Sequence, residues 1–342
     1  MPGNYGFTKK EGKVVAIVGI ETLLFGVDDL PACSRFFEDL GLPLAGTSEK
    51  TVHFRLANGS NVRLHHSNSA LLPSKRGNLT GVREVVWGVS TTSDRDKIAE
   101  DLARDHVITR DDDGTVHFDP GFGVPMGLRL FNPRQVTNAP DQINAPGVVN
   151  RLNRPRKWRR RALPKVISHV VFAAHDHLAA AEFMCRRLNF RISDIQESFA
   201  VYLRADGSTD HHNFLLVNAS LPLPGFDGTD RFHHANFGVE DIDELMVGVN
   251  YMQRHGWSSS EVGLGRHRID SALFYYFPSP TGGEIELGAD ADQLDDSWIP
   301  RRWPVPLFAY ATFVHNLLPF LQTEPEWTFE YITGDPVRAL SR

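Results

Sequence analysis

Four stretches of the sequence decide its fold: TLLFGVDD at 22–29, EVVWGVST at 84–91, HVVFAAHD at 169–176 and HANFGVED at 234–241. They align without gaps, and each has an aromatic residue at its fourth position, followed by Gly or Ala. The aromatic residues are Phe25, Trp87, Phe172 and Phe237. Self-similarity of this kind indicates a repeated structural unit. The sequence therefore predicts four copies of one module.

Each stretch is short and apolar enough for a β-strand, and a residue that can cap a helix follows it, such as Asp29 or Asp241. Helical spacing of apolar residues comes next, as in Ile242, Leu245 and Val249. Shorter strand candidates follow each helix, for example VHFRL and NVRLHH, or LFYYF and EIELG. The unit is therefore βαβββ. We expect an α+β fold in which four βαβββ modules pair into two domains.

Domain boundaries follow from where the repeat pattern stops. Residues 1–133 are expected to form an N-terminal domain and residues 166–291 a C-terminal domain, with a linker at 134–165 that carries a basic run from Arg151 to Arg161. That run could bind an acidic partner, but a solvated, salt-bridged linker is the more ordinary interpretation. The tail at 292–342 is rich in apolar residues, so we expect it to pack on a domain or on another subunit.

Composition excludes several classes of protein. The chain has 342 residues and a formal net charge of −6, and it contains no apolar run of the length that spans a membrane. No nucleic acid or membrane partner is therefore expected. Its two cysteines are too few for a disulfide scaffold or a thiolate zinc site. The first residues carry no apolar stretch typical of a secretory signal, so a cytoplasmic location is expected.

The repeats also predict a metal site. Side chains alternate along a strand, so the first position of each stretch points away from the aromatic residue and toward whatever the sheet encloses. That position is His169 in the third module and His234 in the fourth, and the last strand of the fourth module adds Glu286. Two imidazoles and one carboxylate form a facial triad typical of non-haem Fe(II), although Glu284 shares a strand face with Glu286 and stays an alternative ligand.

The N-terminal modules lack such a set. Their matching residues are Thr22 and Glu84, with Arg129 at the expected place of Glu286. An arginine cannot ligate a cation, so the N-terminal domain should be metal-free.

With this set of residues, the chain resembles the type I extradiol ring-cleavage dioxygenases of the vicinal oxygen chelate (glyoxalase/bleomycin resistance/dioxygenase) superfamily over roughly residues 14–290. The segment GRHRIDSALFYYFPSPTGGEIEL at 265–287 matches that family's signature spacing. The resemblance implies metal ligation by His169, His234 and Glu286, and the repeat register selects His234 over the adjacent His233.

The same resemblance implies roles for four further residues, and nearness in sequence to the signature segment suggests two more, Phe274 and Trp257. His212, rather than its neighbour His211, would be the acid and base. His267 and Tyr276 would hydrogen-bond the substrate oxygens, with Asp270 as an orienting partner. The residues expected to line the substrate site are Asp270, Phe274 and Trp257.

The implied reaction inserts both atoms of O2 into a catechol beside its diol and opens the ring. The implied cofactor is Fe(II), with Mn(II) as a possibility, and the partners are a catecholic small molecule and O2. A homo-oligomer is expected. Two alternatives stay open: another metal-dependent enzyme of the superfamily, such as a glyoxalase-type isomerase or a 2-oxoacid-dependent dioxygenase, and a non-catalytic small-molecule binding protein. Only the dioxygenase needs His212, His267 and Tyr276 together.

Overall fold

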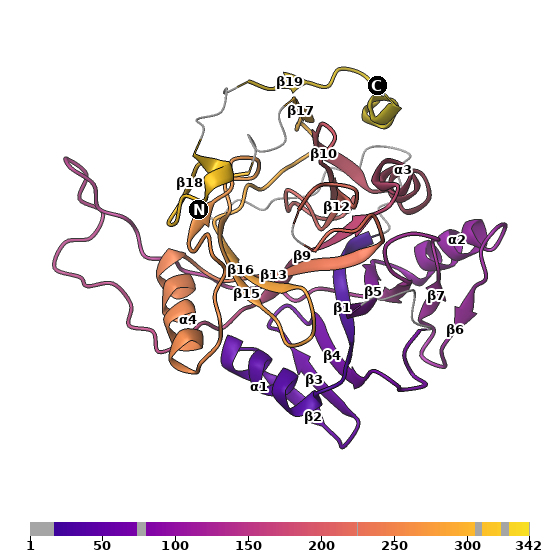
Figure 1. Ribbon diagram of the computed structural model, residues 1–342, viewed down its shortest axis with the longest axis horizontal. Coiled ribbons are helices and arrows are strands. Elements are labelled where there is room, and N and C mark those ends of the chain that lie inside the picture. Colours follow the sequence, from indigo (N-terminus) through magenta and orange to yellow (C-terminus); the bar gives the residue numbers. More distant parts are fainter. Residues whose placement is uncertain (1–16, 74–79, 224, 305–309, 323–327, 342) are drawn as a thin grey trace.

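The computed structural model describes residues 17–73, 80–223, 225–304, 310–322 and 328–341 (Figure 1). Residues 1–16 of the expected N-terminal domain and parts of the expected tail lie outside the described residues. Among the described residues, no helix combines the length and the apolar composition that a membrane span requires.

The predicted module occurs four times. The first contains β1 (Ile17–Val27), α1 (Leu30–Leu40), β2 (Leu44–Thr47), β3 (Thr51–Arg55) and β4 (Asn61–His66). The second contains β5 (Gly81–Val89), α2 (Thr92–Leu102), β6 (Thr109–Arg110), β7 (Val116–Phe118) and β8 (Met126–Leu130). The third contains β9 (Val166–Ala174), α3 (His177–Leu188), β10 (Arg191–Gln196), β11 (Ala200–Arg204) and β12 (Phe214–Asn218). The fourth contains β13 (Arg231–Gly238), α4 (Ile242–Arg254), β14 (Gly265–Arg266), β15 (Leu273–Pro278) and β16 (Glu284–Ala289). The predicted α+β class with βαβββ modules is confirmed.

The last residue of each repeated stretch starts the helix. These residues are Asp29, Thr91, Asp176 and Asp241. In each case the side chain accepts a hydrogen bond from the backbone N–H three residues later, at 2.9–3.1 Å. Such a bond satisfies one of the free N–H groups of the first turn, and each cap stabilises its helix by about 1 kcal/mol. The repeat therefore encodes both the strand and the helix start.

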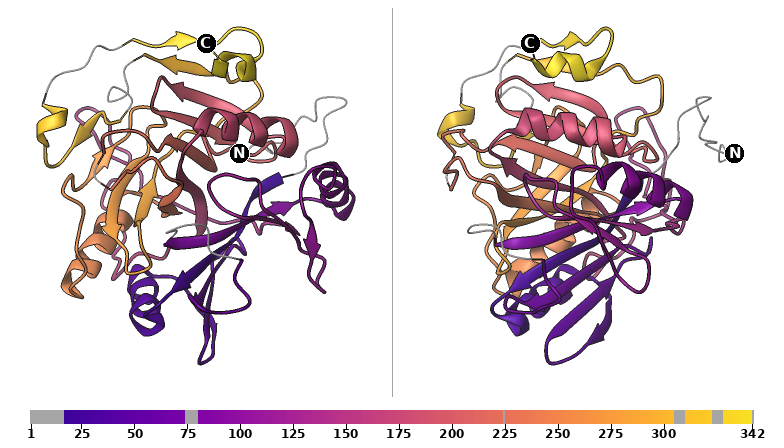
Figure 2. Two further views of the ribbon diagram at one scale, coloured as in Figure 1. Left: turned by 45° about the vertical axis from the view of Figure 1, so that its right-hand side comes forward. Right: turned by 90° about the vertical axis from the view of Figure 1, so that its right-hand side faces the viewer.

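The modules pair into two sheets, which Figure 2 shows from two further directions. The first has the order β2-β3-β4-β1-β5-β8-β7-β6, and the second β18-β14-β15-β16-β13-β9-β12-β11-β10-β17-β19. In each sheet the first strands of two modules run antiparallel at the centre, β1 beside β5 and β9 beside β13. The short tail strands β17 (Arg301–Trp303), β18 (Phe313–Val314) and β19 (Glu330–Tyr331) extend the second sheet at both edges. The described part of the tail thus packs on the C-terminal sheet of its own chain.

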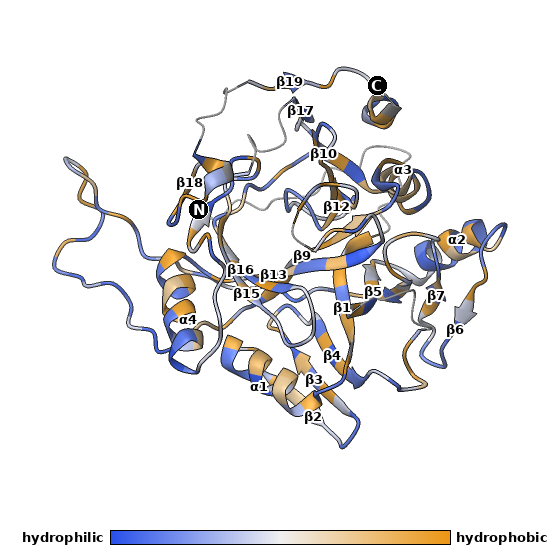
Figure 3. Cartoon of the chain, viewed as in Figure 1, coloured by the Kyte–Doolittle hydropathy of each residue, from blue (hydrophilic) through white to orange (hydrophobic). Residues whose placement is uncertain are grey.

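One apolar core lies beneath the helices of both sheets and contains the four repeat aromatics. Figure 3 marks hydrophobic residues in orange along the helices and strands. Trp87 of β5 packs against Phe190 and Phe214 of the third module at ring distances of 4.9 and 5.6 Å. Phe25 packs against Phe232 of the fourth module at 5.9 Å. The first positions of the repeats therefore face the opposite side of each sheet, as alternation predicts.

A β-bulge precedes the first repeat position in all four modules. The antiparallel registers slip at Glu21, Arg83, Ser168 and His233, each the residue immediately before Thr22, Glu84, His169 and His234. A bulge inserts one extra residue and re-aims the neighbouring side chains. It therefore allows the two histidines to face the concave side while the flanking apolar residues stay in the core.

The strand registers correct one expectation about the N-terminal half. Asn236 of β13 lies opposite Glu286, and the equivalent Val86 of β5 lies opposite Gly127. Gly127, not Arg129, therefore takes the place of Glu286 in the N-terminal sheet. The pairing of β8 with β5 differs by two residues from the position that the sequence comparison of the modules predicts. Arg129 instead pairs with Asp113 at 2.7 Å.

Residues 131–165, all of them described, contain no helix or strand beyond an isolated bridge between Ala145 and Val148. The basic run within this segment pairs with acids at the start of α4. Lys157 lies 2.5 Å from Glu240, and Arg159 lies 3.1 Å from Asp241. These ion pairs favour the salt-bridged linker over a site for an acidic partner.

Stability of the N-terminal sheet should depend on pH through His117 and Glu84. Their side chains are 2.7 Å apart, and the Glu84 hydrogen bond raises the pKa of His117 to about 9 despite partial burial. Because the pKa of His117 is higher in the folded than in the unfolded protein, protonation of His117 stabilises the fold. This stabilisation is complete below pH 6.5, the pKa of His117 in the unfolded chain, and is lost as the pH rises through about 9. The unfolding free energy of the wild type should therefore exceed that of Glu84→Gln by on the order of 2 kcal/mol at pH 6, and this difference should disappear by pH 10.

Urea unfolding at both pH values measures this gap. Asp96→Asn serves as the control, because Asp96 pairs with arginines that stay charged throughout this range. A gap of constant size would contradict the linkage.

Candidate metal centre

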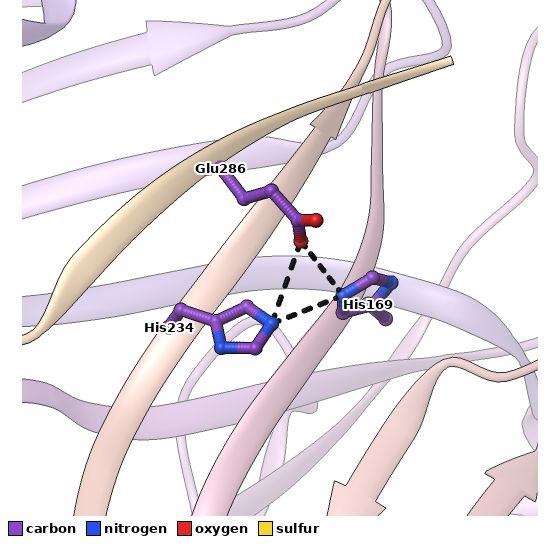
Figure 4. Close-up of side chains that lie close together, drawn as sticks. All are labelled: His169, His234 and Glu286. Atoms are coloured by element: carbon purple, nitrogen blue, oxygen red, sulfur yellow. Dashed lines mark hydrogen bonds and ion pairs between the residues drawn. The ribbon is translucent and has the colours of Figure 1, made fainter. Parts of the chain in front are cut away.

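Three neighbouring strands of the second sheet bring together the predicted ligand triad. His169 comes from β9, His234 from the central β13 and Glu286 from β16 on its other side. Figure 4 shows the three side chains converging on one point. His169 Nε2 lies 3.1 Å and His234 Nε2 lies 3.4 Å from Glu286 Oε2, and the two Nε2 atoms are 3.3 Å apart.

The donor set fits a divalent metal ion. Glu286 is fully buried, and neither of its carboxylate oxygens accepts a well-formed hydrogen bond. Burial opposes ionisation of this carboxyl, but His169 and His267 outweigh it and hold its pKa well below the usual range. An ionised carboxylate without partners is costly inside a protein, and a metal ion held by both imidazoles would compensate it. The residues present can therefore hold a divalent metal ion.

His233 supports the triad instead of competing with His234. Its Nδ1 lies 2.7 Å from His234 Nδ1, so one of these atoms donates to the other. When His234 binds a metal through Nε2, its Nδ1 carries the hydrogen and donates it to His233, an arrangement that fixes the ring. Glu284 lies opposite His234 in the ladder and is not among the converging groups.

His212 lies against the triad. Its ring stacks on His169 with centroids 4.1 Å apart, and both rings line a cavity of about 190 Å³ that Asn236 and Asp270 also border. Burial, followed by the charges of His169 and His211, holds the pKa of His212 well below its ordinary value. A neutral imidazole beside the cavity can accept a proton.

His267 and Tyr276 lie on the other side of Glu286. Tyr276 faces Glu286 across the β15–β16 ladder, and its hydroxyl oxygen is 3.1 Å from His267 Nε2. His267 Nδ1 donates to the Tyr310 carbonyl at 2.6 Å, and its Nε2 lies 3.7 Å from Glu286 Oε1. Burial lowers the pKa of His267, but the nearby carboxylates of Glu286 and Asp270 raise it above its usual value.

The three residues expected to line the substrate site differ in their placement. Asp270 borders the cavity, and its Oδ2 lies 3.8 Å from Nδ1 of His212. Phe274 is fully buried and stacks on His267 with centroids 4.0 Å apart, so it supports that ring from behind.

The expectation that Trp257 lines the substrate site is wrong, because Trp257 does not lie at this site. Its indole N–H donates to Asp39 at 2.9 Å, and its ring packs on Phe36 at 5.0 Å. Both partners belong to α1, on the helix side of the N-terminal sheet. The loop after α4 carries Trp257 toward the contact between α1 and α4, a direction that its nearness in sequence to the signature segment does not reveal.

Sequence reasoning missed a chain of three residues that leads to His212. His211 was considered only as its competitor, yet it joins His212 to Asp194, which is in turn bound by Arg301 of the tail. More than a hundred residues separate Asp194 from Arg301, and neither belongs to the repeat, so no local signal in the sequence links them.

Comparisons with known proteins identify the family of the C-terminal domain and the fold of the chain. The model of the Glyoxalase/Bleomycin resistance protein/Dioxygenase superfamily matches residues 166–287. The domain formed by these residues belongs to that superfamily. Across nearly the whole chain, the protein is 25% identical to metapyrocatechase 2 of Cupriavidus necator, over 309 residues that cover 86% of this chain and 87% of the relative.

Solved structures show the same two-domain vicinal oxygen chelate fold. Homoprotocatechuate 2,3-dioxygenase of Arthrobacter globiformis matches with a TM-score of 0.67 at 18% identity, covering 92% of this chain and 93% of its own. The Mn(II)-bound glyoxalase of Novosphingobium aromaticivorans also reaches 0.67 at 18% identity, covering 92% and 96% of the two chains. At this level of identity, these structures establish the fold alone.

Metal binding should depend on the triad and not on its neighbour. His169→Ala, His234→Ala and Glu286→Gln should each lose bound iron while the fold survives, whereas the matched control Glu284→Gln should keep it. Metal analysis of protein loaded with Fe(II) under anaerobic conditions measures this, and circular dichroism checks the fold. Adding Fe(II) at 100 times its Kd should stabilise wild type by about 2.7 kcal/mol and leave the triad variants unchanged. Full iron retention in both histidine variants would refute the site.

Proposed function

We propose that this protein is an extradiol dioxygenase that uses O2 to open the ring of a catechol beside its two hydroxyl groups. The observation that carries the proposal is the arrangement around the triad: His212 on the His169 side, and His267 with Tyr276 on the Glu286 side. A buried metal site needs none of these three residues merely to hold its ion. Their presence supports chemistry that moves protons at a metal-bound diol.

The proposed cofactor is Fe(II), with Mn(II) as the other candidate. Two imidazoles and one carboxylate suit either ion and leave positions open for further ligands. When bound, the metal would hold a catechol and O2 side by side and pass electron density between them, which lowers the barrier that the triplet state of O2 imposes. Mn(II) is a candidate because the similar glyoxalase structure contains it.

Tyr276 and His267 would position one hydroxyl group of the catechol. Because the His267 Nδ1–H donates to the Tyr310 carbonyl, Nε2 of the neutral ring can accept from the Tyr276 hydroxyl. The lone pairs of that hydroxyl oxygen are then available to accept from the substrate. When His267 is protonated, both of its nitrogens donate, and Tyr276 becomes free to donate to an ionised substrate oxygen instead.

His212 would carry the proton. Its neutral ring can accept a proton from the other hydroxyl group of the catechol and return it as the ring opens. The stacking on His169 holds this imidazole beside the metal ligands, so proton transfer takes place next to the reacting diol.

In this proposal, residues 166–291 form the catalytic domain and residues 1–133 a metal-free domain, with 134–165 as linker and 292–342 as tail. The substrates are a catecholic small molecule and O2. Assembly into a homo-oligomer and a cytoplasmic location stay predictions.

A glyoxalase-type isomerase is the second candidate, because the Mn(II)-bound glyoxalase matches the fold as well as a dioxygenase does. Such an enzyme keeps the triad. It has no need of His212, His267 and Tyr276 together.

A catechol panel tests the proposal. Anaerobically purified protein loaded with Fe(II) should turn some catechol yellow and consume O2 in a one-to-one ratio, followed by absorbance and an oxygen electrode. His212→Asn should bind the same catechol and turn it over about 100-fold more slowly or worse, because general acid–base catalysis contributes this much. The matched control is His255→Asn, an exposed histidine at the end of α4. Isomerisation of a thiohemiacetal without O2 uptake would establish the second candidate instead.

A further inference from the structure

A buried chain of polar side chains leads from the tail of the protein to His212. His211 is 1% exposed, and its two nitrogens face different partners. Nε2 lies 2.7 Å from Asp194 Oδ2 on β10, and Nδ1 lies 3.2 Å from Nδ1 of His212. His211 therefore connects a carboxylate on one side with the proposed acid and base on the other.

Asp194 is an ionised acceptor that the tail holds in place. It is fully buried, and Arg301 of β17 surrounds it with three donors. The Arg301 backbone N–H and Nε donate to Oδ1 at 3.0 and 2.9 Å, and Nη2 donates to Oδ2 at 2.6 Å. The guanidinium lies over the rings of Trp298 and Trp303, with its carbon 4.6 and 5.0 Å from their centroids. An arginine always carries its charge, so Asp194 can only accept a hydrogen bond from His211.

When both rings are neutral, this acceptor fixes which nitrogen carries the hydrogen in each histidine. A neutral imidazole has one donor and one acceptor nitrogen. If His211 Nε2–H donates to Asp194, its Nδ1 has a lone pair and must accept from Nδ1–H of His212. The only nitrogen of His212 with a lone pair is then Nε2. Asp270 also favours a hydrogen on Nδ1 of His212, because its Oδ2 lies 3.8 Å from that nitrogen.

We propose that Arg301, Asp194 and His211 are positioning residues that lock His212 in the Nδ1–H tautomer and so leave Nε2 as the proton acceptor. This proposal rests on the proposed function, in which His212 takes a proton from the catechol. It assigns the tail segment a part in the chemistry beyond packing. A metal ion between His211, His212 and Asp270 is the competing explanation, since their ligand atoms also cluster. That explanation needs a lone pair on both Nδ1 atoms, whereas the proposed hydrogen bond keeps a hydrogen on Nδ1 of His212.

Nitrogen-15 NMR of the metal-free protein reads the tautomers directly. Histidine labelled with nitrogen-15, observed through two-bond proton correlations above pH 7.5, should show His212 as Nδ1–H and His211 as Nε2–H. Spectra of His212→Asn and His211→Asn assign the two rings. An Nε2–H tautomer or a doubly protonated ring for His212 would overturn the proposal, as would zinc binding that removes the hydrogen from both Nδ1 atoms. This measurement needs no activity, so it is independent of the proposed function.

Asp194→Asn tests the consequence for turnover. The amide oxygen should take the place of Oδ1, on which two Arg301 donors converge, so that the amide NH2 replaces Oδ2, loses the bond from Arg301 Nη2 and faces His211. His211 must then accept at Nε2 and donate from Nδ1, which moves the hydrogen of His212 to Nε2. We expect kcat to fall about 100-fold, with KM for the catechol within a few-fold of wild type and the iron content unchanged. The NMR signals should show the switched tautomers.

A double-mutant cycle separates positioning from general structural damage. In the His212→Asn background, Asp194→Asn should cause no further loss of kcat, because its effect acts through His212. An equal loss in both backgrounds would overturn the proposal. The matched control is Arg302→Gln, which removes a neighbouring tail arginine that pairs with Glu197 at 3.1 Å and should leave both kcat and the tautomers unchanged. If wild type oxidises no catechol, the proposed function fails, and the NMR result still decides the tautomers.

Discussion

The buried carboxylate of Glu286 is the constraint on which the site depends. A fully buried, ionised group with two unpartnered oxygens would be strongly unfavourable in an apolar protein. Here it faces two imidazoles from neighbouring strands at 3.1 and 3.4 Å, with His267 at 3.7 Å. These histidines keep the carboxylate ionised without satisfying it by hydrogen bonds. The strands are thus arranged around a negative charge that a bound cation completes.

Duplication explains how such a site arises within an otherwise regular sheet. All four modules share the aromatic core residue, the helix cap and the bulge just before the first repeat position. Only two modules place histidines after their bulges, and only one last strand supplies the carboxylate. The N-terminal sheet keeps the same framework with Thr22, Glu84 and Gly127, so it contributes to the shared core and not to metal binding.

Much of this could be predicted from the sequence because the information is local and repeated. The aromatic at the fourth position and the cap at the eighth gave the modules, and strand alternation gave the faces of His169, His234 and Glu286. Arg129 was misplaced because a register between strands depends on pairing, which the alignment of repeats does not contain. Trp257 was misplaced because a loop set its direction. Asp194, His211 and Arg301 could not be found together, since tertiary contact alone unites them.

The way the tail extends the C-terminal sheet limits how copies of this chain can assemble. Strands of two residues form both ends of that sheet, β18 on one side and β19 on the other. Such short ends present few free N–H and C=O groups to which a neighbouring polypeptide could add a strand. An assembly that continued this sheet from one molecule into the next at β18 or β19 would therefore gain few backbone hydrogen bonds.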